Sequence, residues 1–244
     1  RDKVRAQELL AAAGLHELAD VPVPALSGGQ AAHVALVRAL AARPAVLIVD
    51  EPLAAVDVKS AERWRRFLHA ARADRTTLLV THDALDIAHL AQDILVMESG
   101  QVRAHGATAR LLEAPPTGFV AALAGLNRLE GTVTEIGASA VEVACGDIAV
   151  LATTEHAPLA LGQKVAVTFD PHAAAIGAAQ EPCNQWAARV LAVEATSLAA
   201  MQLRVDLGGQ EATVPIDREF ALDVGVGNIV SLTVSKANVF VHPN

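Results

Sequence analysis

The chain has 244 residues, enough for one large domain or two smaller ones. Hydrophobic residues make up 52% of it and aromatic residues only 3%, so its core must be built from Ala, Val and Leu. The net charge of −8 argues against a nucleic-acid-binding surface, and the distant Cys145 and Cys183 fit neither a disulfide framework nor a metal cluster.

The sequence shows no apolar run of membrane-spanning length and no secretory signal. It opens on Arg1 rather than Met, and its first residues are already helix-like. We therefore expect it to be the later part of a longer protein, in a reducing compartment.

The first half alternates helix and strand signals, which predicts a layered α/β domain with a parallel sheet. Continuous apolar runs predict buried strands, and 3.6-residue periodicity predicts helices. Helices are expected over residues 4–13, 28–42, 61–73, 83–92 and 118–123, and strands over 45–49, 76–81, 94–97 and 101–104.

The helix expected over residues 28–42 starts in an unusual way, at the segment LSGGQ, residues 26–30. Ser27 and Gln30 have the spacing of a capping box, so Ser27 is the predicted N-cap. Gly28 and Gly29 are poor helix formers, but they let another molecule approach the backbone N–H groups, as at an anion site. Taken alone, Ser-Gly-Gly favours an ordinary capped helix.

Two strands that follow end in polar side chains. The strand AVLIVDEP, residues 45–52, ends in Asp50 and Glu51, which point to opposite sides of the chain and cannot share one role. LAAVD places Asp57 before a helix, and LLVTHD, residues 78–83, ends a second strand at His82. Open α/β sheets bind ligands at such strand ends, although each of these residues is common at a solvated strand end.

Together these segments resemble the ATP-binding cassette (ABC) ATPases over residues 1 to about 124. LSGGQ resembles the signature motif, AVLIVDEP the Walker B strand, LAAVD the D-loop and VTHD the switch-histidine segment, in the family's order. The resemblance implies ATP and Mg²⁺ as ligands. Asp50 would bind Mg²⁺ through water, Glu51 would be the general base or orient the water, and His82 would contact the γ-phosphate. Asp57 would couple the two sites of a dimer.

The resemblance also implies that Ser27, Gly28, Gly29 and Gln30 clamp the γ-phosphate of ATP bound to the opposite subunit. Two departures qualify it. The residues after LSGGQ are Ala31, Ala32 and His33 instead of a polar or basic pair, which alters the helix surface more than the phosphate contact. No Gly-x-x-x-x-Gly-Lys-[Ser/Thr] P-loop occurs in the 244 residues, so the chain alone is expected not to hydrolyse ATP efficiently.

Period-two alternation takes over after Pro115-Pro116, as in Met201 to Leu207. Residues 161–168 match residues 226–233, which predicts two similar small β units that close their own edges. We place the boundaries at 1–124, 125–182 and 183–244. The tail resembles tandem Mop-type TOBE domains, OB-like barrels of molybdate importers, on residues 125–127, 131–136 and 234–239.

In that family small polar groups and Lys hold molybdate or tungstate, which makes Ser235 and Lys236 the candidates here. The first repeat has Asp170 and Pro171 at those positions, which counts against a site built symmetrically from both repeats. The alternative is that Ser235 and Lys236 are exposed residues of a purely structural barrel.

The resulting hypothesis is the C-terminal portion of the ATPase subunit of a molybdate-type ABC importer. It implies a homodimer on the cytoplasmic face of the membrane, peripherally bound to a transmembrane permease and indirectly to a solute-binding protein, with regulatory barrels and no nucleic acid. Alternatives are an importer for sulfate, iron, polyamine or sugar, or a non-catalytic oxyanion-binding or regulatory protein. A chromosome-maintenance ATPase would need long heptads near the cassette, and none occur.

Overall fold

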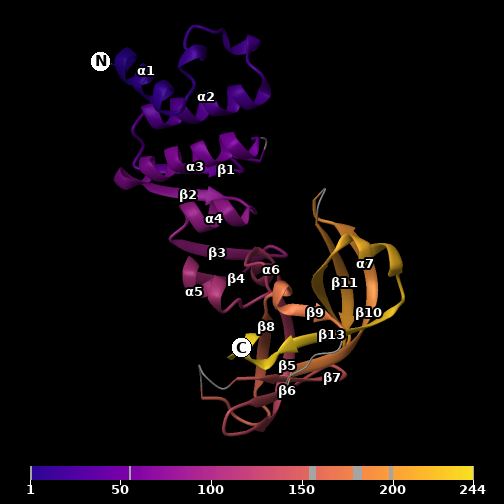
Figure 1. The fold of residues 1–244 in the computed structure, drawn as a ribbon. Helices are drawn as coiled ribbons and strands as arrows, with labels where there is room; N and C mark the ends of the chain where they lie inside the picture. Colours follow the sequence, from indigo (N-terminus) through magenta and orange to yellow (C-terminus); the bar gives the residue numbers. More distant parts are fainter. Residues whose placement is uncertain (1, 55, 154–157, 178–182, 198–199, 244) are drawn as a thin grey trace. The chain divides into compact units, whose positions relative to one another are not determined.

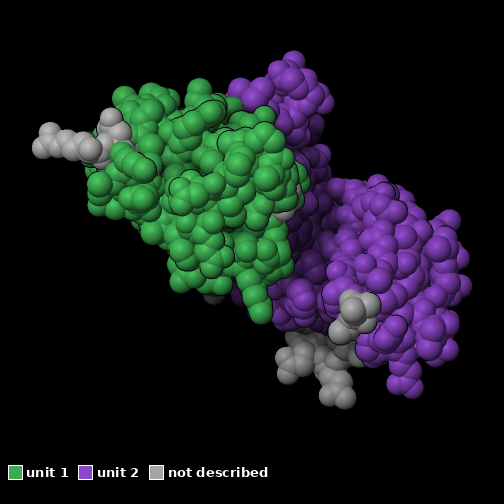
Figure 2. All heavy atoms as spheres, turned by 90° about the horizontal axis from the view of Figure 1, so that it is seen from above, with its two compact units in different colours: residues 1–95, 105–109 green, residues 96–104, 110–244 purple. Residues whose placement is uncertain are grey.

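The computed structural model describes residues 2–54, 56–153, 158–177, 183–197 and 200–243. The chain divides into two compact units, residues 1–95 with 105–109 and residues 96–104 with 110–244 (Figure 2). The order of elements is helical and α/β at first and β-rich afterwards (Figure 1), which confirms the predicted fold class.

Helices and strands alternate through the first half, as predicted. The helices are α1 (Asp2–Ala12), α2 (Gly28–Ala41), α3 (Val58–Ala71), α4 (Ala84–Leu90), α5 (Thr108–Glu113) and α6 (Gly118–Leu123). The strands are β1 (Val46–Asp50), β2 (Thr76–Val80), β3 (Asp93–Glu98) and β4 (Gln101–Ala107). The helix expected from residue 61 begins three residues earlier because the Asp57 side chain caps it.

One hydrophobic cluster packs helices α2 and α3 against β1. It joins Leu36, Val37 and Leu40 of α2, Leu47 of β1, and Trp64 and Leu68 of α3. His33 of α2 stacks on the buried Trp64 with ring centroids 4.1 Å apart, so this unusual residue after the signature segment packs inward instead of only altering the helix surface. Burial, and then the nearby charge of Arg63, lowers the pKa of His33.

Strands β1 and β2 pair in parallel, from Val46 opposite Thr76 to Asp50 opposite Val80. Their predicted burial on both faces is wrong. Leu47 is buried, but Val46, Ile48, Leu78 and Val80 are 57%, 67%, 56% and 48% exposed. The helices of this unit cover one face, and among the described residues no element buries these four side chains.

Strand β3 is not a member of this parallel pair, contrary to expectation. It forms its own two-stranded sheet with β4. The connection is Ser99-Gly100, whose φ angles of +50° and +74° are those of the tight turns that fit the twist of a hairpin. A two-residue connection leaves no room for the crossover helix that a parallel pairing of β4 with β3 would require.

The second half forms two five-stranded antiparallel sheets around one hydrophobic cluster. Its strands are β5 (Asn127–Ile136), β6 (Val141–Cys145), β7 (Ile148–Ala152), β8 (Lys164–Phe169), β9 (Ala174–Ile176), β10 (Cys183–Ala195), β11 (Met201–Leu207), β12 (Gln210–Ile216), β13 (Ile229–Ser235) and β14 (Val239–Pro243). Helix α7 (Arg218–Asp223) lies between β12 and β13 in the chain. The repeat predicted from residues 161–168 and 226–233 corresponds to β8 and β13.

The two repeats exchange their last strands. The sheet orders are β14-β8-β5-β6-β7 and β12-β11-β10-β13-β9, so β14 of the second repeat pairs with β8 of the first. Strand β9 of the first repeat in turn pairs with β13 of the second. The expectation that each unit closes its own edge is therefore wrong, because each sheet is completed by a strand from the other repeat.

Two buried asparagines at equivalent positions join the repeats. Asn127 at the start of β5 donates to the Thr213 carbonyl at 2.8 Å and accepts from the Thr213 N–H at 2.7 Å. Asn184 at the start of β10 bonds Leu151 in the same way, at 2.8 and 2.7 Å. Each amide thus satisfies both backbone groups of one residue in the other repeat.

Among the described residues, every helix is too short or too polar to span a membrane.

Candidate functional site

Helix α2 begins with the predicted capping box. The Ser27 hydroxyl accepts from the Gln30 N–H at 3.3 Å, and the Gln30 side chain accepts from the Ser27 N–H at 2.9 Å. The first N–H groups of a helix have no intrahelical partner. The N–H groups of Gly28 and Gly29 make no hydrogen bond to any residue that the structure describes. They are therefore free to bind an anion.

Space at Gly28 supports that interpretation. A Cβ added there would meet no atom within 4 Å, and the φ angle of Gly28 does not lie in the left-handed region. Neither internal packing nor backbone conformation therefore requires glycine at this position. A close approach by another molecule is a physical reason for glycine at position 28 that remains.

The parallel pair β1–β2 positions a second group of polar residues at its carboxyl end. Asp50 is the last residue of β1 and is exposed. The Glu51 N–H donates to the Val80 carbonyl at 2.9 Å, and its φ of +44° turns the chain sharply after the strand. Thr81, His82 and Asp83 follow β2 at the same edge.

His82 and Glu51 form a direct pair across this edge. His82 Nδ1 lies 2.6 Å from Glu51 Oε1, with the two side chains 75% and 35% exposed. The hydrogen bond to Glu51, together with its charge, raises the pKa of His82, and Asp83 and Asp86 add smaller effects in the same direction. The motifs predict separate roles for these two residues, and it is the register of Asp50 opposite Val80 that brings the segments after β1 and β2 together.

Asp57 is engaged locally. Its carboxylate caps α3 by accepting from the Ser60 N–H at 3.1 Å. Hydrogen bonding from the Ser60 side chain, and then from this N–H, lowers the pKa of Asp57. Within the described part of the chain, no hydrogen bond or ion pair joins residues 27–30 to Asp50, Glu51 or His82. The start of α2 and the edge of the parallel pair are thus two separate phosphate-compatible surfaces.

Asp50 fits a magnesium ion of the kind that nucleotide sites hold. No group of three or more His, Cys, Asp or Glu side chains that could enclose a metal occurs among the described residues. Mg²⁺ in such sites keeps several waters and takes one or two carboxylates plus substrate phosphates. One exposed carboxylate at a strand end meets that requirement.

The tail candidates Ser235 and Lys236 lie at the end of β13. The Ser235 hydroxyl caps a short 3-10 turn by accepting from the Ala237 N–H at 3.4 Å. Asp170 caps the equivalent turn in the first repeat, accepting from the His172 N–H at 2.8 Å. The two repeats therefore use different residues for one capping role, and Lys236 is half-buried beside it.

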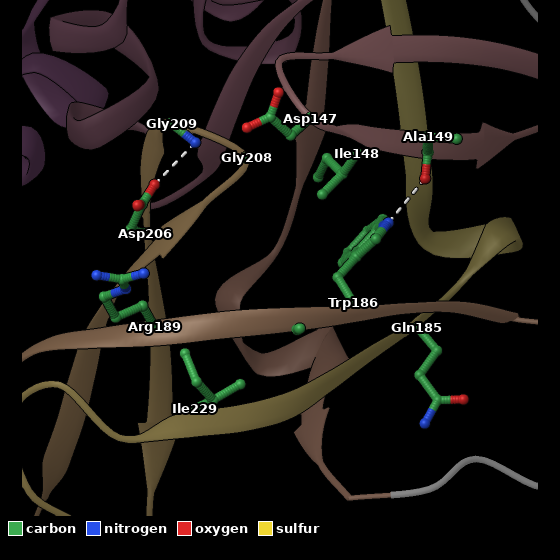
Figure 3. Close-up of a pocket in the computed structure, with 11 residues that line it drawn as sticks. Asp147, Ile148, Ala149, Gln185, Trp186, Arg189, Asp206, Gly208, Gly209 and Ile229 are labelled. Atoms are coloured by element: carbon green, nitrogen blue, oxygen red, sulfur yellow. Dashed lines mark hydrogen bonds between the residues drawn. The ribbon is translucent and has the colours of Figure 1, made fainter.

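The second compact unit also contains a pocket that none of the sequence motifs predicts. It has a volume of about 630 Å³ and lies between the β6–β7 and β11–β12 turns (Figure 3). Its lining combines Arg189, Asp147 and Asp206 with the apolar Ile148 and Ile229. The Trp186 indole at its wall already donates to the Ala149 carbonyl at 2.7 Å. Ser235 and Lys236 are not among its lining residues, so this pocket is separate from the predicted oxyanion position.

The chain is similar to known proteins of one family. Residues 1–54 match the ABC transporter family. A molybdenum import ATP-binding protein, ModC, of Mycobacterium tuberculosis is 42% identical over 135 residues, which are 54% of this chain and 37% of that protein. A sulfate/thiosulfate import ATP-binding protein, CysA 1, of Chromobacterium violaceum is 35% identical over 232 residues, or 91% of this chain and 62% of that protein.

The chain thus spans between about a third and three fifths of the length of these curated relatives. Among solved structures, the cytoplasmic molybdate-binding protein ModG gives a TM-score of 0.42 at 24% identity, covering 48% of this chain and 96% of ModG. A putative metal-chelate type ABC transporter also gives a TM-score of 0.42 at 24% identity, covering 54% of this chain and 52% of that one.

Proposed function

This chain is homologous to the ABC transporter ATPases of molybdenum and sulfate import, and on that premise we propose that it supplies two phosphate-facing surfaces of an ATP-driven importer. The start of α2 is one surface, and the Glu51–His82 edge is the other. The observation that carries the proposal is the pair of free N–H groups at Gly28 and Gly29, at the start of a helix whose cap is complete.

The first surface acts on a nucleotide held by a second subunit. The Gly28 and Gly29 N–H groups and the helix dipole favour the negative γ-phosphate. Ser27 and Gln30 keep the first turn in place through their reciprocal hydrogen bonds, and the Ser27 hydroxyl lies at the same edge. This arrangement makes the site incomplete without a P-loop, which is not found within these 244 residues.

The second surface serves the nucleotide of its own cassette. Glu51 orients the attacking water or accepts its proton, and Asp50 holds Mg²⁺ through water. When bound, Mg²⁺ neutralises charge on the phosphates. Because His82 uses Nδ1 to bond Glu51, its Nε2 is the ring atom left for the γ-phosphate. The raised pKa of His82 favours the protonated ring, in which both nitrogens donate.

The proposed assembly is a homodimer bound peripherally to a transmembrane permease at the cytoplasmic face of the membrane. A solute-binding protein would act indirectly through that permease. ATP binding closes the dimer, and hydrolysis reopens it. Asp57 lies at the start of α3, between the Walker B segment and Arg65, where it would couple the two sites.

Complementation in trans tests the ATPase part of the proposal. The purified chain alone is expected to show only background Mg²⁺-dependent phosphate release, because its 244 residues contain no P-loop motif. Adding it to a family cassette that has a P-loop, but whose own signature serine is replaced, should restore hydrolysis. Activity of the chain alone that Glu51→Gln abolishes would contradict the proposal.

The second part of the proposal is that the tail binds an oxyanion, molybdate or a related one, at Ser235 and Lys236. Support comes from the half-buried Lys236 and from relatives that divide between molybdenum and sulfate import. The alternative of a non-catalytic oxyanion-binding or regulatory protein shares this site and differs only in predicting no hydrolysis in trans.

Equilibrium titration calorimetry with molybdate, tungstate and sulfate tests the tail. We expect molybdate and tungstate to bind more tightly than sulfate, and Lys236→Ala to weaken binding at least roughly tenfold by removing a charge-assisted contact. Lys164→Ala, which removes an exposed lysine of the other repeat, is the matched control. Unchanged affinity in Lys236→Ala would make the barrels purely structural at this position.

A further inference from the structure

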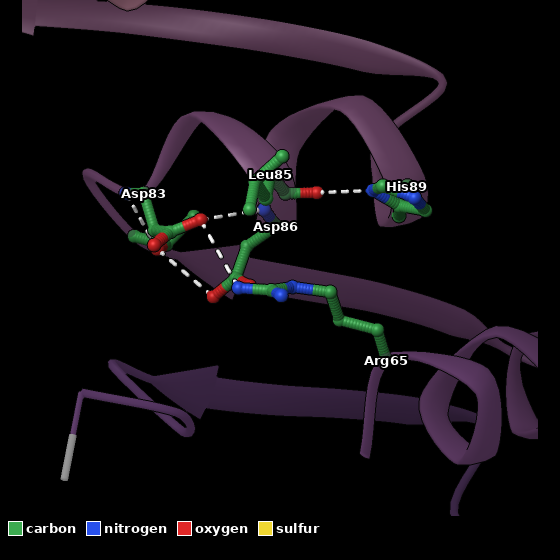
Figure 4. Close-up of polar contacts among 6 residues, drawn as sticks. Arg65, Asp83, Leu85, Asp86 and His89 are labelled. Carbon is green, nitrogen blue, oxygen red and sulfur yellow. Dashed lines mark hydrogen bonds and ion pairs between the residues drawn. The ribbon is translucent and has the colours of Figure 1, made fainter. Parts of the chain in front are cut away.

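A buried ion pair joins helices α3 and α4 (Figure 4). Arg65 of α3 donates from Nε to Asp86 Oδ1 of α4 at 2.6 Å. The Arg65 side chain is 11% exposed and the Asp86 side chain 4%. Both charges are thus largely removed from water, and a buried ion pair of this kind contributes little net stability compared with well-packed apolar residues. The role of this ion pair is therefore to be sought in how it orients the residues around it.

The pair extends to both neighbours of His82. Thr81 donates from its hydroxyl to Asp86 Oδ2 at 3.4 Å, and Arg65 Nη2 lies 3.3 Å from Asp83 Oδ1. The same Asp83 oxygen accepts from the Asp86 N–H at 2.9 Å, and the Asp83 N–H donates to the Thr81 hydroxyl at 3.1 Å. The chain on either side of His82 is therefore anchored to Arg65 and Asp86.

The His82 ring, in contrast, has little support of its own. Its side chain is 75% exposed, and among the described residues its one side-chain hydrogen bond is with Glu51. The direction of the ring must therefore be set by the backbone of the loop that carries it. Arg65 sits about two turns beyond Asp57 on α3, so the same helix leads from Asp57 to the anchor of His82.

We propose that Arg65 is a positioning residue for His82. Through Asp86 and the two residues that flank the histidine, it fixes the loop so that Nδ1 meets Glu51, and it ties this loop to the helix that Asp57 caps. The consequence for catalysis rests on the proposed function, whereas the positioning itself is a property of this chain without nucleotide.

The test measures the His82–Glu51 contact by ¹⁵N-histidine NMR of the full chain, without ATP. A His82→Gln variant assigns the His82 resonances among the nine histidines. Glu51→Gln gives the reference position of a His82 ring that has lost its carboxylate partner. The informative variant is the double substitution Arg65→Met with Asp86→Leu, which removes the ion pair without leaving one buried charge unpaired.

We expect the His82 ring resonances of the double variant to move most of the way to the Glu51→Gln position. Backbone amide exchange at Asp83 and Asp86 should rise by roughly tenfold or more, as loss of hydrogen bonds to charged groups predicts. Arg66→Met is the matched control, since this neighbouring arginine is 74% exposed and its ion pair, among the described residues, is with Glu62 at 3.9 Å. It should change neither the His82 resonances nor the amide exchange.

Two results overturn the proposal. One is a folded double variant whose His82 resonances stay at the wild-type position, and the other is an equal displacement in Arg66→Met. Neither outcome depends on ATP hydrolysis, so failure here and failure of the complementation assay are distinguishable.

Discussion

At the scale of single residues, the pairing of Glu51 with His82 determines where a proton sits in the candidate site. Glu51 raises the pKa of His82 above its ordinary value of 6.5. The protonated ring is then present over a wider pH range, with Nε2 as a donor toward a phosphate. The two residues are 31 positions apart in sequence, and only the pairing of β1 with β2 joins them.

A pH titration of His82 by NMR checks this pairing. The stabilising effect of the pair is fully present below the ordinary pKa of 6.5 and is lost as the pH rises through the higher pKa of the folded state. Glu51→Gln should return the pKa of His82 toward 6.5. Glu62→Gln on the exposed face of α3 should leave it unchanged, and a His82 pKa at 6.5 in the wild-type chain would contradict the geometry.

At the scale of elements, local sequence signals predicted most helices, strands and caps. The capping box of Ser27 and Gln30 is confirmed, and so are the strands around residues 46–50 and 76–80. Burial of these strands could not be predicted, because a run such as Val46–Asp50 does not reveal whether one or both faces are covered. Ser99-Gly100 predicts the turn from β3 to β4, but it does not reveal that these strands form a sheet of their own.

The asparagine links between the repeats give a prediction at this scale. Asn184→Ala should lower the free energy of unfolding by about 2 kcal/mol, since it removes two hydrogen bonds and leaves the backbone groups of Leu151 unpaired. Urea unfolding checks this value. The neighbouring Gln185→Ala, an exposed side chain bonded to Ser231, should change stability by less than about 0.5 kcal/mol. Equal effects of the two substitutions would show that the Asn184 hydrogen bonds contribute no more to the free energy of unfolding than those of an exposed side chain.

At the scale of the whole molecule, the tandem repeat was visible in the sequence, but the exchange of its last strands was not. Residues 161–168 and 226–233 identify equivalent strands, whereas β9 and β14 are short segments that could pair in either sheet. The sheet that each of these strands joins depends on long-range packing. We propose on this basis that residues 125–182 and 183–244 fold as one body and not as two separable domains.

Ending the chain after Asn238 tests this exchange. Val239 is fully buried and pairs with Phe169, so removal of β14 should loosen the first repeat, which is distant in sequence. Hydrogen exchange should accelerate at β8, residues 164–169, while β11 and β12 in the same sample stay protected. Acceleration confined to the second repeat would mean that each repeat closes on its own strands.

The central claim is that the start of α2 binds a phosphate, and two substitutions of Ser27 test it most directly. Asp is as good an N-cap as Ser, so Ser27→Asp keeps the helix but brings a negative charge to the phosphate position. Ser27→Thr keeps both the cap and the hydroxyl, and Ser139→Ala, in an exposed bend of the other compact unit, is the control.

The measurement is ATP hydrolysis in trans, with a partner cassette that has a P-loop but a replaced signature serine. We predict that the wild-type chain, Ser27→Thr and Ser139→Ala restore Mg²⁺-dependent hydrolysis, and that Ser27→Asp reduces it by roughly a hundredfold or more, as loss of a preorganised anion site predicts. Hydrolysis with Ser27→Asp at the level of the wild-type chain would contradict the claim.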